Sequence, residues 1–121
     1  MTIEKIDGEF CVCKVSSSAA LDLSADFCFV GKTDRELSLV CRPDSAPADT
    51  TAREDGWRAF RVSCAMDFSL VGILSEISGI LAKAKISIFA VSTFDTDYIL
   101  VKAENYERAL KSLQENGWRV E

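Results

Sequence analysis

The clearest pattern of hydrophobic and polar positions lies in the second half of the chain. Between positions 70 and 84 the apolar residues recur at steps of three and four, which is the spacing of one face of an α-helix. They are Leu70, Ile73, Leu74, Ile77, Ile80, Leu81 and Ala84. Apolar segments at residues 86–92 and 97–102 then flank a polar stretch. This order predicts a helix, capped by Asp67 or Ser69, that runs into a β-hairpin.

The remaining elements of this half are a second helix and two more strands. Residues 104–116 repeat the helical spacing, and the Gly117 that follows is a typical helix stop. Strands are predicted at residues 57–65 and 118–120. The order is therefore βαββαβ. It predicts a ferredoxin-like α+β fold in which two helices cover one face of an antiparallel sheet.

The first half carries strand and turn signals but little helix. Residues 9–15 alternate between apolar and polar, and residues 27–30 and 36–41 are apolar segments around a turn-like stretch. This predicts one strand followed by a hairpin. Single helical turns are expected near residues 19–23 and within a proline-containing linker at 42–55.

Short phrases shared by the two halves suggest a duplication. Asp55-Gly56-Trp57-Arg58 resembles Asn116-Gly117-Trp118-Arg119, and we expect a turn at Asp55-Gly56. We interpret residues 1–56 as a degenerate copy of the module at residues 57–121, in which most of the first helix is lost.

Charge and composition narrow the function. The 121 residues carry a net charge of −5 and include no histidine. The acidic charge argues against binding to nucleic-acid phosphates, and the lack of histidine removes the commonest general base. No apolar run approaches the roughly 20 residues that span a membrane. The charged residues 1–10 do not match a secretory signal, so a cytoplasmic protein is expected.

The cysteines and carboxylates do not predict a metal site. The five cysteines are Cys11, Cys13, Cys28, Cys41 and Cys64. They form no Cys-x-x-Cys pair, and no histidine is present to complete a zinc site. Asp67, Asp95 and Asp97 do not follow the spacing of a calcium loop. We expect buried free thiols and no bound metal.

Two segments together resemble the ACT domain, a small ligand-sensing module of amino-acid metabolism. They are Asp67-Phe68-Ser69-Leu70-Val71-Gly72-Ile73-Leu74 and Ser92-Thr93-Phe94-Asp95-Thr96-Asp97-Tyr98-Ile99-Leu100-Val101. They are most similar to small bacterial proteins with two tandem ACT-like halves, the first degenerate. The hairpin is also similar to that of the CASTOR arginine sensors and of aspartokinase regulatory domains.

This resemblance implies a degenerate ACT-like half at residues 1–56 and an ACT domain at residues 57–121. It also implies a non-catalytic regulatory module that needs no cofactor. Such modules usually pair with themselves and act on a second, regulated protein, which the sequence does not identify.

The candidate ligand site combines the start of the helix with the hairpin. Free amides at a helix N-terminus bind anions, and the hairpin carboxylates can accept hydrogen bonds from an ammonium group. In the related sensors the equivalents of Gly72, Thr93, Phe94 and Asp97 lie at the ligand. The full predicted set is Asp67, Ser69, Leu70, Val71, Gly72, Ile73, Ser92, Thr93, Phe94, Asp95, Thr96 and Asp97.

Several of these residues also have a structural explanation. Gly72 is compatible with close packing of the helix against the sheet, and Phe94 is either a lid over a ligand or an anchor in a partner chain. We expect a homodimeric module that binds a free amino acid, because apolar strands need cover on both faces. The alternative is a ligand-free structural or oligomerisation protein of the same architecture. An enzyme is not expected, because no nucleophile and base pair is visible.

Overall fold

The computed structural model describes residues 1–63 and 72–121. Contacts between residues group the chain into two compact units. Unit 1 consists of Met1–Asp7 and Arg58–Glu121, and unit 2 consists of Gly8–Trp57. The two long strands β1 (Thr2–Val15) and β4 (Ala52–Val62) contribute residues to both units.

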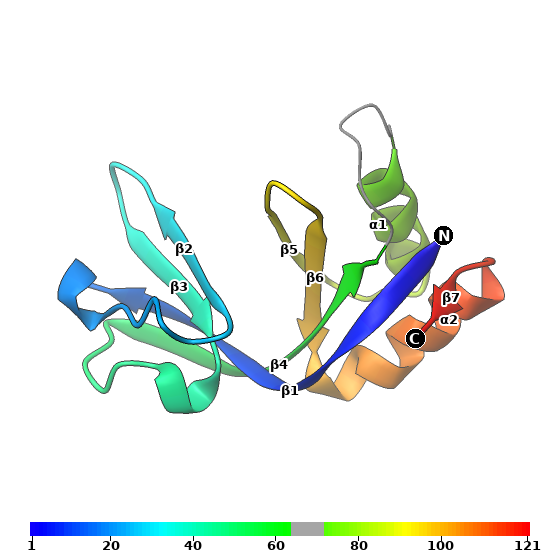
Figure 1. The fold of residues 1–121 in the computed structure, drawn as a ribbon. Helices are drawn as coiled ribbons and strands as arrows, with labels where there is room; N and C mark the ends of the chain where they lie inside the picture. Colours follow the sequence, from blue (N-terminus) through cyan, green and yellow to red (C-terminus); the bar gives the residue numbers. More distant parts are fainter. Residues whose placement is uncertain (64–71) are drawn as a thin grey trace. The chain divides into compact units, whose positions relative to one another are not determined.

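From β4 onward, unit 1 has the predicted order of elements. Beyond its parts of β1 and β4 it contains α1 (Ile73–Lys83), β5 (Phe89–Ser92), β6 (Asp97–Lys102), the short 3₁₀ helix η3 (Ala103–Asn105), α2 (Tyr106–Glu115) and β7 (Arg119–Val120). The strands are hydrogen-bonded in the order β1-β4-β6-β5, and β7 pairs with β1 in parallel (Figure 1). The ferredoxin-like βαββαβ fold is confirmed.

The core of unit 1 lies between its sheet and both helices. Strand residues such as Phe60 and Ile99 pack in one cluster with Ile77 and Leu81 of α1 and Leu113 of α2, and all five are fully buried. Complete burial of one such side chain contributes about 1.5–3 kcal/mol. The predicted helical stripe is therefore the face that holds α1 on the sheet.

Unit 2 is built around a hairpin with little helix. It contains the 3₁₀ helix η1 (Ser18–Ala20), β2 (Cys28–Lys32), β3 (Leu37–Cys41) and the 3₁₀ helix η2 (Pro43–Ser45). Its strands follow the order β2-β3-β1-β4. The predicted hairpin and the two single helical turns are confirmed. The core of unit 2 consists of Cys11, Cys13, Val15, Leu39 and Cys41.

The first strand is longer than the sequence predicted. It begins at Thr2 instead of Glu9. Ile3 and Ile6 are buried along this added part, whereas the residues around them are polar. These two isoleucines are three positions apart and are flanked by charged residues, so the segment lacks the period-two alternation that predicts a strand.

The predicted turn at Asp55-Gly56 is wrong. Both residues lie inside β4, which begins at Ala52, within the predicted linker. Gly56 has a φ of +83°, which only glycine adopts readily. A glycine at positive φ inside a strand is typical of a β-bulge, and the turn-like pair does not end the strand.

The helix and the strand after it start later than predicted. α1 begins at Ile73 with Gly72 as its N-cap, so the prediction of a start at Leu70 with Asp67 or Ser69 as cap placed the start too early. Asp67, Ser69 and Leu70 themselves lie outside the described residues. β5 begins at Phe89 instead of Ile86.

Candidate functional site

The turn between β5 and β6 is closed by its own threonines. The Thr93 amide donates to the Thr96 carbonyl at 2.8 Å, and the Thr93 hydroxyl donates to the same oxygen at 3.0 Å. The Thr96 hydroxyl donates to the carbonyl of Val62 at 2.6 Å, which ties the turn to the end of β4. Both hydroxyl protons are therefore donated within the protein.

Asp97 is the one buried charged or polar side chain among the described residues, at 8% exposure. The Ser92 hydroxyl, from the opposite strand, donates to its Oδ1 atom at 2.6 Å. An ionised carboxylate away from water is costly unless hydrogen bonds or a cation compensate it. The first residue of β6 thus places a carboxylate where a cationic group would be stabilised.

The helix α1 begins at a glycine N-cap. Gly72 is exposed, has a φ of +87° and makes no side-chain cap hydrogen bond. No atom of the described residues lies within 4 Å of the position that a Cβ would take, so close helix packing does not explain this glycine. The amides of the first turn carry the positive end of the helix dipole.

The hairpin turn and the N-terminal end of α1 lie at the same end of unit 1 (Figure 1). The other predicted residues are placed differently. Ile73 is a core residue at 8% exposure, Phe94 is 82% exposed, and Asp95 is exposed in the turn. Asp67, Ser69, Leu70 and Val71 lie outside the described residues.

Sequence reasoning missed a charged hollow beside the hairpin. It has a volume of about 410 Å³ and is lined by Glu4, Arg61, Val62, Ser63, Asp95, Thr96 and Tyr98. The Arg61 guanidinium donates to the Glu4 carboxylate (Nε to Oε1, 3.1 Å) and to the Tyr98 hydroxyl (3.3 Å). The Tyr98 hydroxyl and then the Glu4 carboxylate raise the pKa of Arg61.

No local pattern could have found this cluster. Glu4 and Arg61 are 57 positions apart, and Glu4 lies in the part of β1 that was not predicted as a strand. Ile3 and Ile6 are three positions apart and do not follow the period of two that marks a strand, so this segment carried no strand signal.

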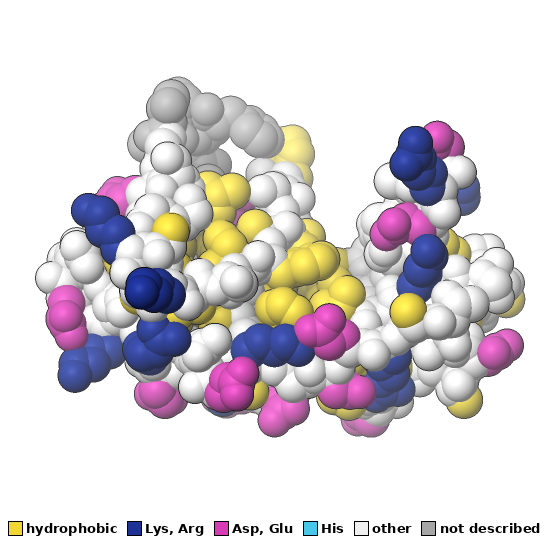
Figure 2. Space-filling view, turned by 180° about the vertical axis from the view of Figure 1, so that it is seen from behind, with side chains coloured by type: hydrophobic (Ala, Val, Ile, Leu, Met, Phe, Trp, Pro, Cys, Tyr) yellow, Lys and Arg dark blue, Asp and Glu magenta, His cyan; other side chains and the backbone are white. Residues whose placement is uncertain are grey.

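One face of the molecule is mixed in charge (Figure 2). Figure 2 shows basic and acidic side chains interspersed over one face, with hydrophobic side chains gathered between them. Among residues 1–63 and 72–121, no group of three or more metal-ligating side chains is placed to hold an ion. In the same part of the chain, no helix is long and apolar enough to cross a membrane.

Comparison with known proteins agrees with this fold. A family model described as the ACT domain matches residues 52–115. A crystal structure of protein Atu0741 from Agobacterium tumefaciens is 31% identical, with a TM-score of 0.86 over 99% of this chain and 91% of that one. None of the curated protein sequences matches.

Two further structures share the fold at lower identity. VC0802 from Vibrio cholerae, described as a protein of unknown function and possible transport protein, is 21% identical with a TM-score of 0.73, over 92% of this chain and 85% of that one. Aspartate kinase from Clostridium acetobutylicum, described as an allosteric enzyme, is 14% identical with a TM-score of 0.70, over 93% of this chain and 34% of that one.

These matches define a small protein with the ACT fold. The chain belongs to the ACT domain family, whose members serve in general as regulatory, ligand-binding modules.

Proposed function

We propose that this protein senses a free amino acid, or a similar small zwitterion, through a two-sided clamp in unit 1. Asp97 accepts a hydrogen bond from the ligand's ammonium group, and the first-turn amides of α1 donate to its carboxylate. The buried Asp97 carboxylate is the observation that carries the proposal, because a cation beside it offsets the cost of its burial.

The N-terminus of α1 would supply the hydrogen-bond donors for the ligand's carboxylate. Since Gly72 brings no side-chain oxygen to the first-turn amides, a ligand carboxylate can take the place of a capping group. Backbone carbonyls of Ser92, Thr93 and Phe94 can accept further hydrogen bonds. The ligand charge pattern that fits is one ammonium and one carboxylate held a few bonds apart.

The protein acts, in this proposal, as a cytosolic homodimer that signals to a separate protein and carries out no reaction. Hydrophobic side chains gathered on one face support pairing (Figure 2). The free thiols of Cys11, Cys13, Cys28 and Cys41 agree with a reducing compartment. The exposed Phe94 fits either a ligand lid or a contact with the second copy.

A thermal-shift screen tests ligand binding. The melting temperature is measured with each of the twenty amino acids at millimolar concentration. A ligand at about 100 times its dissociation constant adds about 2.7 kcal/mol to the free energy of unfolding. An increase with one chemical subset is expected. Absence of any increase favours the alternative, a ligand-free structural protein with ACT architecture.

Two matched variants locate the site. Asp97→Asn removes the charge while keeping the shape, and it should abolish the ligand-dependent increase. Asp34→Asn changes an exposed aspartate in the other hairpin and should leave the increase unchanged. If Asp97→Asn keeps the full increase, the ligand binds elsewhere.

A further inference from the structure

The cysteines of unit 2 form one connected cluster on a single face of its sheet. Cys41 of β3 lies directly opposite Cys11 of β1 and directly opposite Cys28 of β2. Residues directly opposite in a sheet project from the same face, so the three thiols form a row across three strands. Cys13 adds a fourth thiol two positions along β1, on the same face as Cys11.

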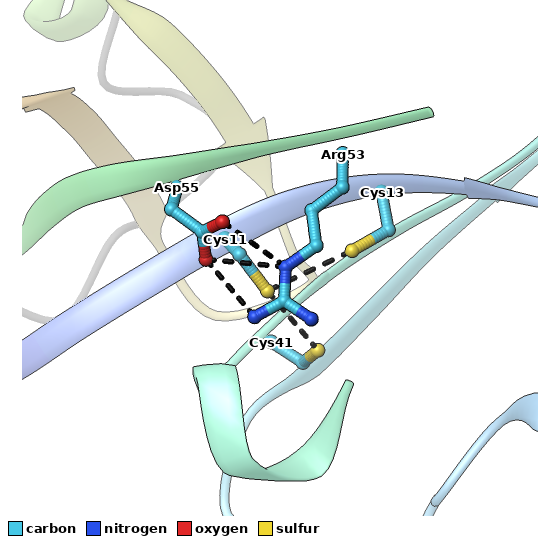
Figure 3. Close-up of polar contacts among 5 residues, drawn as sticks. All are labelled: Cys11, Cys13, Cys41, Arg53 and Asp55. Carbon is cyan, nitrogen blue, oxygen red and sulfur yellow. Dashed lines mark hydrogen bonds and ion pairs between the residues drawn. The ribbon is translucent and has the colours of Figure 1, made fainter. Parts of the chain in front are cut away.

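The sulfur atoms in this row are close together. The Sγ atoms of Cys11 and Cys41 are 3.9 Å apart, and those of Cys11 and Cys13 are 3.7 Å apart (Figure 3). Exposure falls along the row, since Cys28 is half-buried whereas Cys41 and Cys11 are 1% and 0% exposed. A small oxidant can therefore reach the row from the Cys28 end.

Backbone geometry allows two pairs, Cys11–Cys41 and Cys28–Cys41, to form a disulfide, and the sulfur contact favours the first. A disulfide needs Cα atoms about 4.4–6.8 Å apart. Opposite residues of an antiparallel pair are about 4.5–5.5 Å apart, well inside this range. Cys11 and Cys13 are two residues apart on one strand, about 6.8 Å, at the upper limit. Cys11–Cys41 therefore combines a suitable backbone with sulfur contact.

A cation lies beside the inner thiols. The Arg53 guanidinium, held by Asp55 with Nη2 to Oδ1 at 3.0 Å, lies close to Cys11 and Cys13 (Figure 3). Its charge lowers the pKa of both thiols, although burial raises the pKa of each by more. The net direction is upward, and burial together with the Asp22 carboxylate also raises the pKa of Cys28. These thiols are therefore mainly protonated at neutral pH, and oxidation should speed up as the pH rises.

We propose that unit 2 is a site of reversible oxidation by hydrogen peroxide, in which Cys28, Cys41 and Cys11 act in sequence and a Cys11–Cys41 disulfide is the product. Cys28 thiolate attacks the peroxide O–O bond, and Cys28 sulfenic acid and water form. The Cys41 thiol then displaces the hydroxyl group as water, which gives a Cys28–Cys41 disulfide. Cys11 thiolate attacks the Cys41 sulfur and releases Cys28. Overall, two thiols and one peroxide give one disulfide and two waters.

Peptide mapping of the oxidised native protein tests this proposal. The protein is treated with hydrogen peroxide, its remaining thiols are alkylated, and disulfide-linked peptides are fragmented so that Cys11 and Cys13 are distinguished. A Cys11–Cys41 disulfide that dithiothreitol reverses is expected. A native protein that forms no intrachain disulfide, or that pairs other cysteines, would overturn the proposal.

Single variants in a Cys64→Ser background test the order of the steps. Cys11→Ser should accumulate the Cys28–Cys41 disulfide, and Cys41→Ser should lose both disulfides. Cys28→Ser, at a half-buried position, should form Cys11–Cys41 more slowly than the background protein. If Cys28→Ser oxidises as fast as the background, Cys28 is not the point of entry. These readouts do not depend on amino-acid binding.

Discussion

The two hairpins of the molecule have the same turn, but they differ in the residue that begins the second strand. In the β2–β3 turn the Thr33 amide donates to the Glu36 carbonyl at 2.9 Å, and in the β5–β6 turn the Thr93 amide donates to the Thr96 carbonyl at 2.8 Å. In both, the strands resume pairing at the next residue. The backbone is therefore shared, and the side chains decide what each hairpin can do.

The first residue of the second strand differs between them. Lys32 pairs with Leu37 in unit 2, whereas Ser92 pairs with Asp97 in unit 1. Leu37 packs against the cysteine-containing core, but Asp97 is a buried carboxylate hydrogen-bonded to its partner serine. One position thus changes a structural hairpin into a candidate ligand site.

The largest contrast is expected in the two cores. Leu81 of α1 is fully buried, whereas Leu37 of β3 is only partly buried. Leu81→Ala should lower the free energy of unfolding by about 2–5 kcal/mol, because it leaves a cavity between helix and sheet. Leu37→Ala should cost less than half as much. Equal losses, measured by urea denaturation, would contradict the difference between the cores.

Raising the pH from 9 to 11 should lower the free energy of unfolding through Cys13 in unit 2. Burial, with a further contribution from neighbouring Cys11, raises the pKa of Cys13 from 9.0 to about 11. Arg53 lowers this pKa and Asp55 raises it by smaller amounts. The folded state therefore binds more protons than the unfolded state between these pH values. The stabilisation is complete below pH 9 and is lost as the pH rises toward 11, by about 2–3 kcal/mol in total.

Denaturation of Cys13→Ala across the same pH range isolates this effect. The variant should lose less stability between pH 9 and 11 than the wild-type protein does. Parallel stability curves for the two proteins would show that the folded state does not protect this thiol from ionisation.

Two glycines near and within α1 should respond in opposite directions. Gly72 has a φ of +87°, so Gly72→Ala should destabilise by about 1–2 kcal/mol. Gly79 lies inside the helix with open space at its Cβ position, so Gly79→Ala should stabilise by about 0.5–1 kcal/mol. Thermal unfolding of both variants checks this, and a shift in the same direction for both would contradict it.

The last contrast concerns the serine that contacts Asp97. Ser92→Ala removes the donor to a buried carboxylate and should cost about 1 kcal/mol. Ser38→Ala removes an exposed contact to Glu36 in the other hairpin and should stay within about 0.5 kcal/mol. Equal effects in denaturation would mean that Asp97 does not depend on this hydrogen bond.

The sequence predicted the parts that repeat a simple period. The apolar stripe that includes Ile77 and Leu81 became the buried face of α1, and β6 has the predicted bounds of 97–102. The prediction was wrong where charged residues interrupt the apolar pattern or where a contact joins distant parts of the chain. Charged residues concealed the start of β1, and Gly56 stayed in its strand by taking a positive φ.

Contacts of the candidate site that are local in sequence could be predicted, and long-range ones could not. The local contacts Ser92–Asp97 and Thr93–Thr96 could be anticipated from a hairpin. The Arg61–Glu4 pair could not, because it depends on which strands become neighbours. The burial of Asp97 also follows from packing across the whole unit and leaves no mark in the sequence around it.

Amide NMR shifts on adding the amino acid found in the screen give the most direct test of the clamp. The account predicts that amides of residues 72–76 and 92–97 shift together and saturate at one ligand concentration, while amides of residues 33–36 in the β2–β3 turn stay unchanged. Saturating shifts at residues 33–36, or at only one of the two unit 1 segments, would contradict it.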